Sequence, residues 1–223
     1  MNWILLINIQ DYINRINVMA KVNPAISIPV SNDQELSLAI DTVDVALQNI
    51  HNYLANHPEK KAKIRFPRGY LGTINGHISK YSWLENSILS KNIAYQHVFV
   101  DTLRWLANHT DLFSSGRDMV LKNILVANAS IFEALLYGSI KQLNYVEGKV
   151  PTRLNRLLKE GVISNSLFAE LKWLWNFRQS IHVQTVDVLE RERYSAADAN
   201  RSTRALENFK SALNTYFVKL DFI

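Results

Sequence analysis

The chain has 223 residues, of which 48% are hydrophobic and 20% are charged, the composition of an ordinary globular protein that can bury a substantial core. Seven glycines and five prolines are few, which favours helices over a turn-rich all-β fold. The absence of cysteine excludes disulfides and thiolate metal sites, and it fits a cytoplasmic location. A net charge of +5 is compatible with a polyanionic partner.

The N-terminus is apolar but too short to span a membrane, because polar residues from Asn8 to Arg15 interrupt it. A positive region typical of a secretory signal is absent, so we expect no membrane association. The pattern favours an amphipathic helix whose apolar face carries Leu5, Ile9, Tyr12, Ile16 and Met19. An alternative is that the protein naturally starts at Met19 and that the preceding residues are a translated leader.

Pro24 and Pro29 predict that residues 23–31 form an extended linker. A helix then runs from about residue 34 to 56, with Asn32 or Asp33 as its cap. Its apolar residues follow the three-and-four spacing of one helix face, at Leu36, Ile40, Val43, Leu47, Ile50 and Leu54.

Residues 59–82 are the least regular part of the chain, because Pro67 and three glycines prevent a long helix. Basic and aromatic side chains are interleaved here, which suits contacts with phosphates and bases. The same composition is also typical of a solvated connector. The candidates for RNA contacts are Lys63, Arg65 and Arg68, with Arg153 and Arg156 further along the chain.

The rest of the chain predicts five helices joined by short loops. They cover about residues 83–108, 117–145, 152–160, 164–183 and a final stretch from near Ser195 to Leu220. Residues 111–116 are predicted to form a turn, and Gly161 is predicted to end the helix before it. We therefore predict an all-α helical bundle, with an N-terminal helical region over residues 1–112 and a second helical domain over residues 113–223.

The predicted helix over residues 117–145 is apolar nearly all round, as a central core helix would be. Glu133 sits in its middle. Because a buried carboxylate needs a partner, we expect a basic residue from a neighbouring helix beside it.

Arg178 and His182 are four residues apart, which on one helix places both side chains on one face. A cation that holds phosphate would then lie beside a side chain that moves protons near neutral pH. In RNA cleavage without a metal, a base takes the 2′-hydroxyl proton and a cation stabilises the phosphorane-like transition state. One Arg and one His are too few for every role, and two chains across a twofold axis would supply two of each.

Asn176, Gln179 and Ser180 are candidates to orient the phosphate. The competing interpretation is structural, with Arg178 on the helix surface or paired with Glu133 or Glu170. We expect no cofactor and no metal ion, because the sequence has neither a glycine-rich phosphate loop nor a histidine pair with metal-ligand spacing on a helix.

The segment Phe177–Val183 resembles the Arg-polar-x-x-His motif of the HEPN superfamily of helical domains. Residues 124–136, with Ser130 and Glu133, resemble the family's early core helix, and residues 157–163 resemble the lead-in to its motif helix. Tyr194–Ala199 resembles the start of its final helix. The match covers about residues 117–220. Three residues separate Arg178 from His182 where the family usually has four to six, and Gln179 replaces the usual Asn or Asp.

The resemblance implies a HEPN-like helical bundle that forms a homodimer with the two motifs facing each other. Active members are metal-independent endoribonucleases of toxin–antitoxin, phage-defence and RNA-processing systems, in which an antitoxin protein is a further partner. Other members lack activity and bind RNA, nucleotides or proteins. The resemblance thus assigns catalysis to Arg178 and His182 and leaves a non-catalytic binding module as the alternative.

Overall fold

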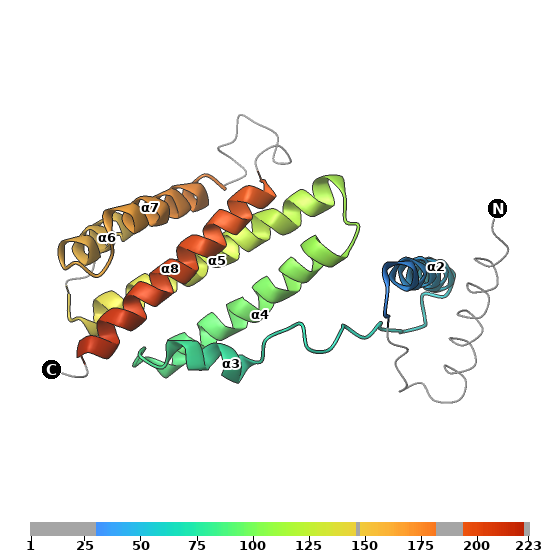
Figure 1. Ribbon diagram of the computed structural model, residues 1–223, viewed down its shortest axis with the longest axis horizontal. Helices are drawn as coiled ribbons and strands as arrows, with labels where there is room; N and C mark the ends of the chain where they lie inside the picture. Colours follow the sequence, from blue (N-terminus) through green and yellow to red (C-terminus); the bar gives the residue numbers. More distant parts are fainter. Residues whose placement is uncertain (1–29, 146–147, 182–193, 221–223) are drawn as a thin grey trace. The chain divides into compact units, whose positions relative to one another are not determined.

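The computed structural model describes residues 30–145, 148–181 and 194–220 of the chain, in which helices joined by loops are the regular structure and no strand occurs (Figure 1). The predicted all-α class is therefore confirmed. The helices are α2 (Asp33–Asn56), α3 (Ile74–Ile78), a 3₁₀ turn η1 (Ser79–Tyr81), α4 (Ser87–His109), α5 (Ser114–Gln142), α6 (Val150–Lys159), α7 (Asn165–Gln179) and α8 (Ala196–Leu220). The amphipathic helix expected over residues 5–19 lies outside the described residues.

The chain divides into two compact units, Met1–Phe66 and Pro67–Ile223. This division differs from the boundary predicted near residue 112. The physical reason is that α4 packs along α5 and buries Ile93, Val100 and Leu103, so that residues 67–112 belong to the bundle. The first unit contains α2, none of whose residues is buried.

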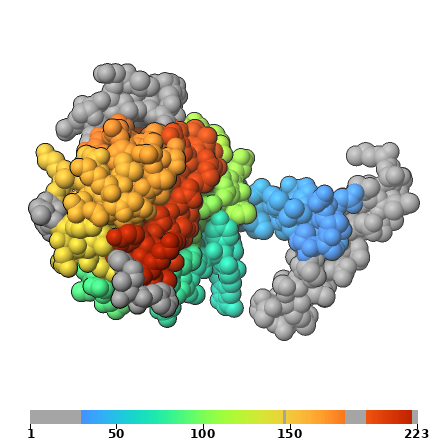
Figure 2. Space-filling model, turned by 60° about the vertical axis from the view of Figure 1, so that its left-hand side comes forward, coloured from blue at the N-terminus to red at the C-terminus, as the bar shows by residue number. Residues whose placement is uncertain are grey.

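Helix α5 is the centre of the second unit, where it contacts α4, α6, α7 and α8. Helices α6, α7 and α8 lie together on one face of this unit (Figures 1 and 2). Among the described residues, α5 alone is long and apolar enough to cross a membrane by length and composition. More than half of its apolar stretch, 56%, is buried in the bundle, as the predicted role of a central core helix requires.

Side-chain caps set most of the helix starts. Asn32 accepts a hydrogen bond from the Glu35 amide at the start of α2, and Ser164 caps α7 in the same way. The Ser195 hydroxyl accepts from the Asp198 amide at the start of α8, which confirms the capping pair predicted there.

Two helix starts differ from prediction, and two short elements were not predicted. Helix α4 starts at Ser87 rather than near residue 83, because Asn86 accepts hydrogen bonds from the first free amides of the helix. Helix α5 starts at Ser114, inside the predicted turn. The short helix α3, capped by Thr73, lies in the stretch predicted to be irregular, and so does η1.

Candidate functional site

Arg178 lies in the last turn of α7, which ends at Gln179 rather than near Val183. The helix ends here because the Ser180 amide bonds to the carbonyls of Asn176 and Phe177, tightening the turn, while the Ser180 hydroxyl donates to the Phe177 carbonyl at 2.7 Å. His182 lies outside the described residues. Because α7 ends at Gln179, the expected placement of Arg178 and His182 on one helix face is wrong, and only a meeting of the two side chains stays a prediction.

Arg178 meets Glu133 of α5, the partner that the buried-carboxylate argument anticipated. Arg178 Nε lies 2.9 Å from Glu133 Oε1, and the side chains are 35% and 27% exposed. Neither atom has a hydrogen bond among the described residues, so the contact is a close ion pair without hydrogen-bond geometry. Burial raises the pKa of the Glu133 carboxyl above its ordinary value, and the Arg178 charge opposes this only in part.

The other acid considered for Arg178 is already engaged. Glu170 accepts two hydrogen bonds from Arg201 of α8, at 2.8 and 3.0 Å. The Arg201 guanidinium also stacks 4.0 Å from the ring centre of Trp173. The structure therefore pairs Arg178 with Glu133 and Arg201 with Glu170.

The ion pair belongs to a longer polar surface along α5. Glu133, Tyr137 and Lys141 are spaced four residues apart and so lie on one face of this helix. From α6, the Arg153 guanidinium lies 5.3 Å from the centre of the Tyr137 ring, and Lys141 Nζ lies 5.9 Å from the same ring. We call this set, with Arg178, the α5 face. It joins three cations, one aromatic ring and one acid of raised pKa.

Arg156, the other candidate on α6, also lies over an aromatic ring. Its guanidinium is 4.2 Å from the centre of the Tyr145 ring and pairs with Glu160 at 2.8 Å. Both predicted arginines of α6 therefore contact tyrosines. Aromatic rings and cations therefore lie close together here, which is the combination that stacks on RNA bases and binds phosphates.

The residues predicted to orient the phosphate lie in the last turn of α7 and directly after it. Asn176 and Ser180 line a shallow pocket with Trp173 and Phe177, and Arg178 is not among its lining residues. Two residues along a helix turn the side chain by about 200°, so Asn176 points away from Arg178. Gln179 is exposed next to the helix end.

The three basic candidates before α3 fall on both sides of the division between the units. Lys63 and Arg65 are exposed residues of the first unit, and Arg68 is an exposed residue of the second. Lys63 and Arg65 therefore belong to a different unit from Arg178.

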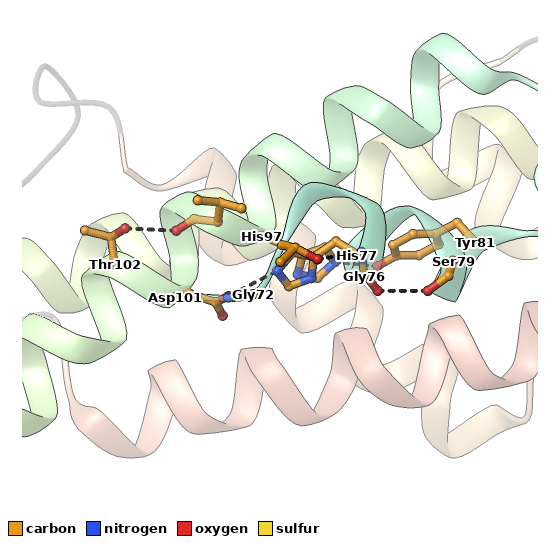
Figure 3. Close-up of polar contacts among 10 residues, drawn as sticks. Gly72, Gly76, His77, Ser79, Tyr81, His97, Asp101 and Thr102 are labelled. Carbon is orange, nitrogen blue, oxygen red and sulfur yellow. Dashed lines mark hydrogen bonds and ion pairs between the residues drawn. The ribbon is translucent and has the colours of Figure 1, made fainter. Parts of the chain in front are cut away.

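His77 and His97, which are distant in the sequence, lie next to each other in the second unit (Figure 3). Asp101 Oδ2 accepts from His77 Nε2 at 3.1 Å and from the Gly72 amide at 3.0 Å, and His97 Nε2 shares a hydrogen bond with the Tyr81 hydroxyl. Both histidines are buried, so solvent and substrate do not reach them. No group of three metal-ligating side chains occurs among the described residues. We therefore interpret this cluster as structural, because its hydrogen bonds hold residues 72–81 against α4.

Comparison with known proteins finds no match, either to a family model, to a curated protein or to a solved structure. The candidate site therefore rests on the chemistry of its residues.

Sequence reasoning missed Tyr137 and Lys141. Their four-residue spacing from Glu133 was visible in the sequence. The contact of Arg153 with Tyr137 was not, because it depends on how α6 folds back onto α5.

Proposed function

We propose that this chain is a HEPN-like, RNA-directed protein that cleaves RNA without a metal ion as a homodimer, in the manner of toxin–antitoxin or phage-defence ribonucleases. The observation that carries the proposal is the α5 face, where Arg178 and Glu133 meet beside Tyr137, Arg153 and Lys141. Cations beside an aromatic ring suit a single-stranded polyanion with stacked bases.

In the proposed reaction, Arg178 releases Glu133 and binds the scissile phosphate. A base takes the proton of the 2′-hydroxyl, and the 2′-oxygen attacks phosphorus. The bond to the 5′-oxygen breaks, and that oxygen receives a proton, which leaves a 2′,3′-cyclic phosphate and a 5′-hydroxyl. His182 and Glu133 are the proposed proton carriers, and burial raises the pKa of Glu133, which favours the protonated form that can donate a proton.

A second candidate function is RNA binding without cleavage. It is favoured by the ion pair itself, because an arginine held by Glu133 at 2.9 Å must break that contact before it binds phosphate. In this second function, the α5 face binds RNA through Arg153, Lys141 and Tyr137. Arg178 then stabilises the fold through its ion pair with Glu133.

The test is cleavage of a mixed RNA pool in EDTA by the wild type and by His182→Ala and Arg178→Ala. Arg204→Ala, which changes an exposed arginine of α8, is the matched control. Cleavage by the wild type and the control, with a loss of at least a hundredfold in both other variants, would support the ribonuclease. Unchanged cleavage by His182→Ala would refute the proposed chemistry.

RNA binding is measured on the same proteins across salt concentrations. If the α5 face binds phosphates, Arg153→Ala and Lys141→Ala will each lower the slope of log K against log salt by about 1. The control Arg204→Ala will leave it unchanged. If neither Arg153→Ala nor Lys141→Ala alters the salt dependence of RNA binding, and no cleavage occurs, RNA is refuted as the ligand of this surface.

A further inference from the structure

Helix α2 exposes an apolar stripe that nothing described in its own unit buries. Leu36, Ile40, Val43, Leu47 and Ile50 are between 38% and 54% exposed, and no residue of the helix is buried. A helix of 24 residues with such a stripe is normally stabilised by packing that stripe against another element.

The spacing of the stripe identifies the kind of partner. The apolar residues recur after four, three, four, three and four residues, which is the 3.5-residue period of a coiled-coil seam. In heptad terms the a positions are Ile40, Leu47 and Leu54, and the d positions are Leu36, Val43 and Ile50. This regular seam is typical of pairing with another helix.

The charges of α2 argue against a nucleic acid or an anionic membrane as the partner. The helix contains four acidic residues, Asp33, Glu35, Asp41 and Asp44, and no lysine or arginine. Amphipathic helices that bind anionic surfaces carry basic residues on the polar face.

The same charges favour a second copy of α2 in antiparallel orientation. All four acids lie in the N-terminal half, and the C-terminal half after Asp44 carries no Asp, Glu, Lys or Arg. Antiparallel pairing places each acidic half beside an uncharged half and opposes the two helix dipoles. Parallel pairing would bring all eight acids of a dimer to one end.

The seam is also self-complementary in this orientation. When Val43 packs beside Leu47 of the partner subunit, Ile40 packs beside the partner's Ile50 and Leu36 beside the partner's Leu54. This register overlaps nearly the whole of both helices, as an isologous twofold interface requires. The seam would bury on the order of 1,000 Å² in total, near the lower limit for a specific interface.

We propose that α2 is a self-association element that pairs in antiparallel orientation with α2 of a second copy of this chain. The proposal rests on α2 and not on the α5 face, so RNA cleavage could fail while self-association through α2 holds.

Cross-linking of the full chain tests the pairing, since the natural chain has no cysteine. Under mild oxidation, a mixture of Val43→Cys and Leu47→Cys proteins should form several-fold more disulfide dimer than either protein alone. Val45→Cys is the matched control, because Val45 lies on the opposite face of α2 and is 62% exposed. No excess over this control would overturn the proposal, and efficient cross-linking by each variant alone would overturn the antiparallel arrangement.

Sedimentation equilibrium gives the second measurement. Leu47→Glu should weaken self-association through α2 at least tenfold, and Val45→Glu, which adds the same charge outside the seam, should leave it unchanged. Equal association of both variants would contradict the seam. A monomeric Leu47→Cys protein whose thiol resists a maleimide would also overturn the proposal, because another part of the same chain would then cover the seam.

Discussion

The imidazole rings of His77 and His97 lie stacked, with centroids 5.1 Å apart and planes within 9° of parallel. One ring comes from α3 and the other from α4, and both are buried. A charge on the His97 ring is therefore unfavourable at this buried position. Desolvation, with a smaller contribution from His77, lowers the pKa of His97 from its ordinary value to about 4.

This pKa predicts a loss of stability in mild acid. The unfolded chain takes up a proton at His97 near pH 6.5, and the folded chain does so only near pH 4. His97 therefore contributes stability that is fully present above about pH 6.5 and is lost as the pH falls toward 4. The total loss is about 3 kcal/mol. Urea denaturation between pH 7.5 and 4.5 measures it.

The control for this prediction is His97→Phe, which keeps a ring at this position but cannot take up a proton. Its free energy of unfolding should change less with pH than that of the wild type over the same range. His51→Gln, a change at an exposed position of α2, should leave the wild-type slope intact. An equal slope in wild type and His97→Phe would mean that other groups control the acid response.

Gly72 is predicted to tolerate no side chain. A Cβ atom there would lie 2.3 Å from His77 Nε2 and 3.1 Å from Asp101 Oδ2, inside the hydrogen-bonded cluster. Gly72→Ala should displace His77 from Asp101 and lower the free energy of unfolding by about 1–3 kcal/mol. Gly116→Ala, where the new atom meets only the Leu112 side chain at 3.3 Å or more, should be near neutral in the same thermal or urea unfolding assay.

The Glu133–Arg178 pair is predicted to respond asymmetrically to mutation. Arg178→Ala leaves a partly buried carboxylate without its cation, whereas Glu133→Gln removes the charge that burial opposes. At pH 7 we expect Arg178→Ala to cost about 1 kcal/mol and Glu133→Gln to cost less, since both side chains are partly exposed.

The pH dependence of the same variants checks the cause. Protonation removes the need for a cation, so the cost of Arg178→Ala should shrink as the pH falls through the raised pKa of Glu133. NMR titration of Glu133 should show a still higher pKa in Arg178→Ala. Equal costs for both variants at every pH would contradict this account of the pair.

Asn128 is predicted to be a structural link between α5 and α8. Its side-chain amide donates to Ser202 Oγ at 2.9 Å and to Thr203 Oγ1 at 3.1 Å, within the core. Asn128→Ala should lower the free energy of unfolding by about 1–2 kcal/mol through the lost hydrogen bonds and the cavity. Asn123→Ala, an exposed change on the same helix, should cost little; a similar loss from both would argue against the link.

The positions of most helices could be predicted because their causes are local. The apolar spacing of α2 and the caps at Asn32, Ser164 and Ser195 involve residues within one or two turns, so the sequence displays them directly. The same local reasoning missed α3, which is five residues long and offers too few apolar positions for a period.

The sequence by itself determined an all-α fold and the need of Glu133 for a cation. Only the tertiary structure decided that Arg178 pairs with Glu133, whereas Glu170 pairs with Arg201. It also decided that His77 stacks on His97 and that α4 packs in the bundle. The physical reason is that each of these contacts joins residues distant in the chain. Such contacts depend on how whole helices pack, which no spacing within one helix records.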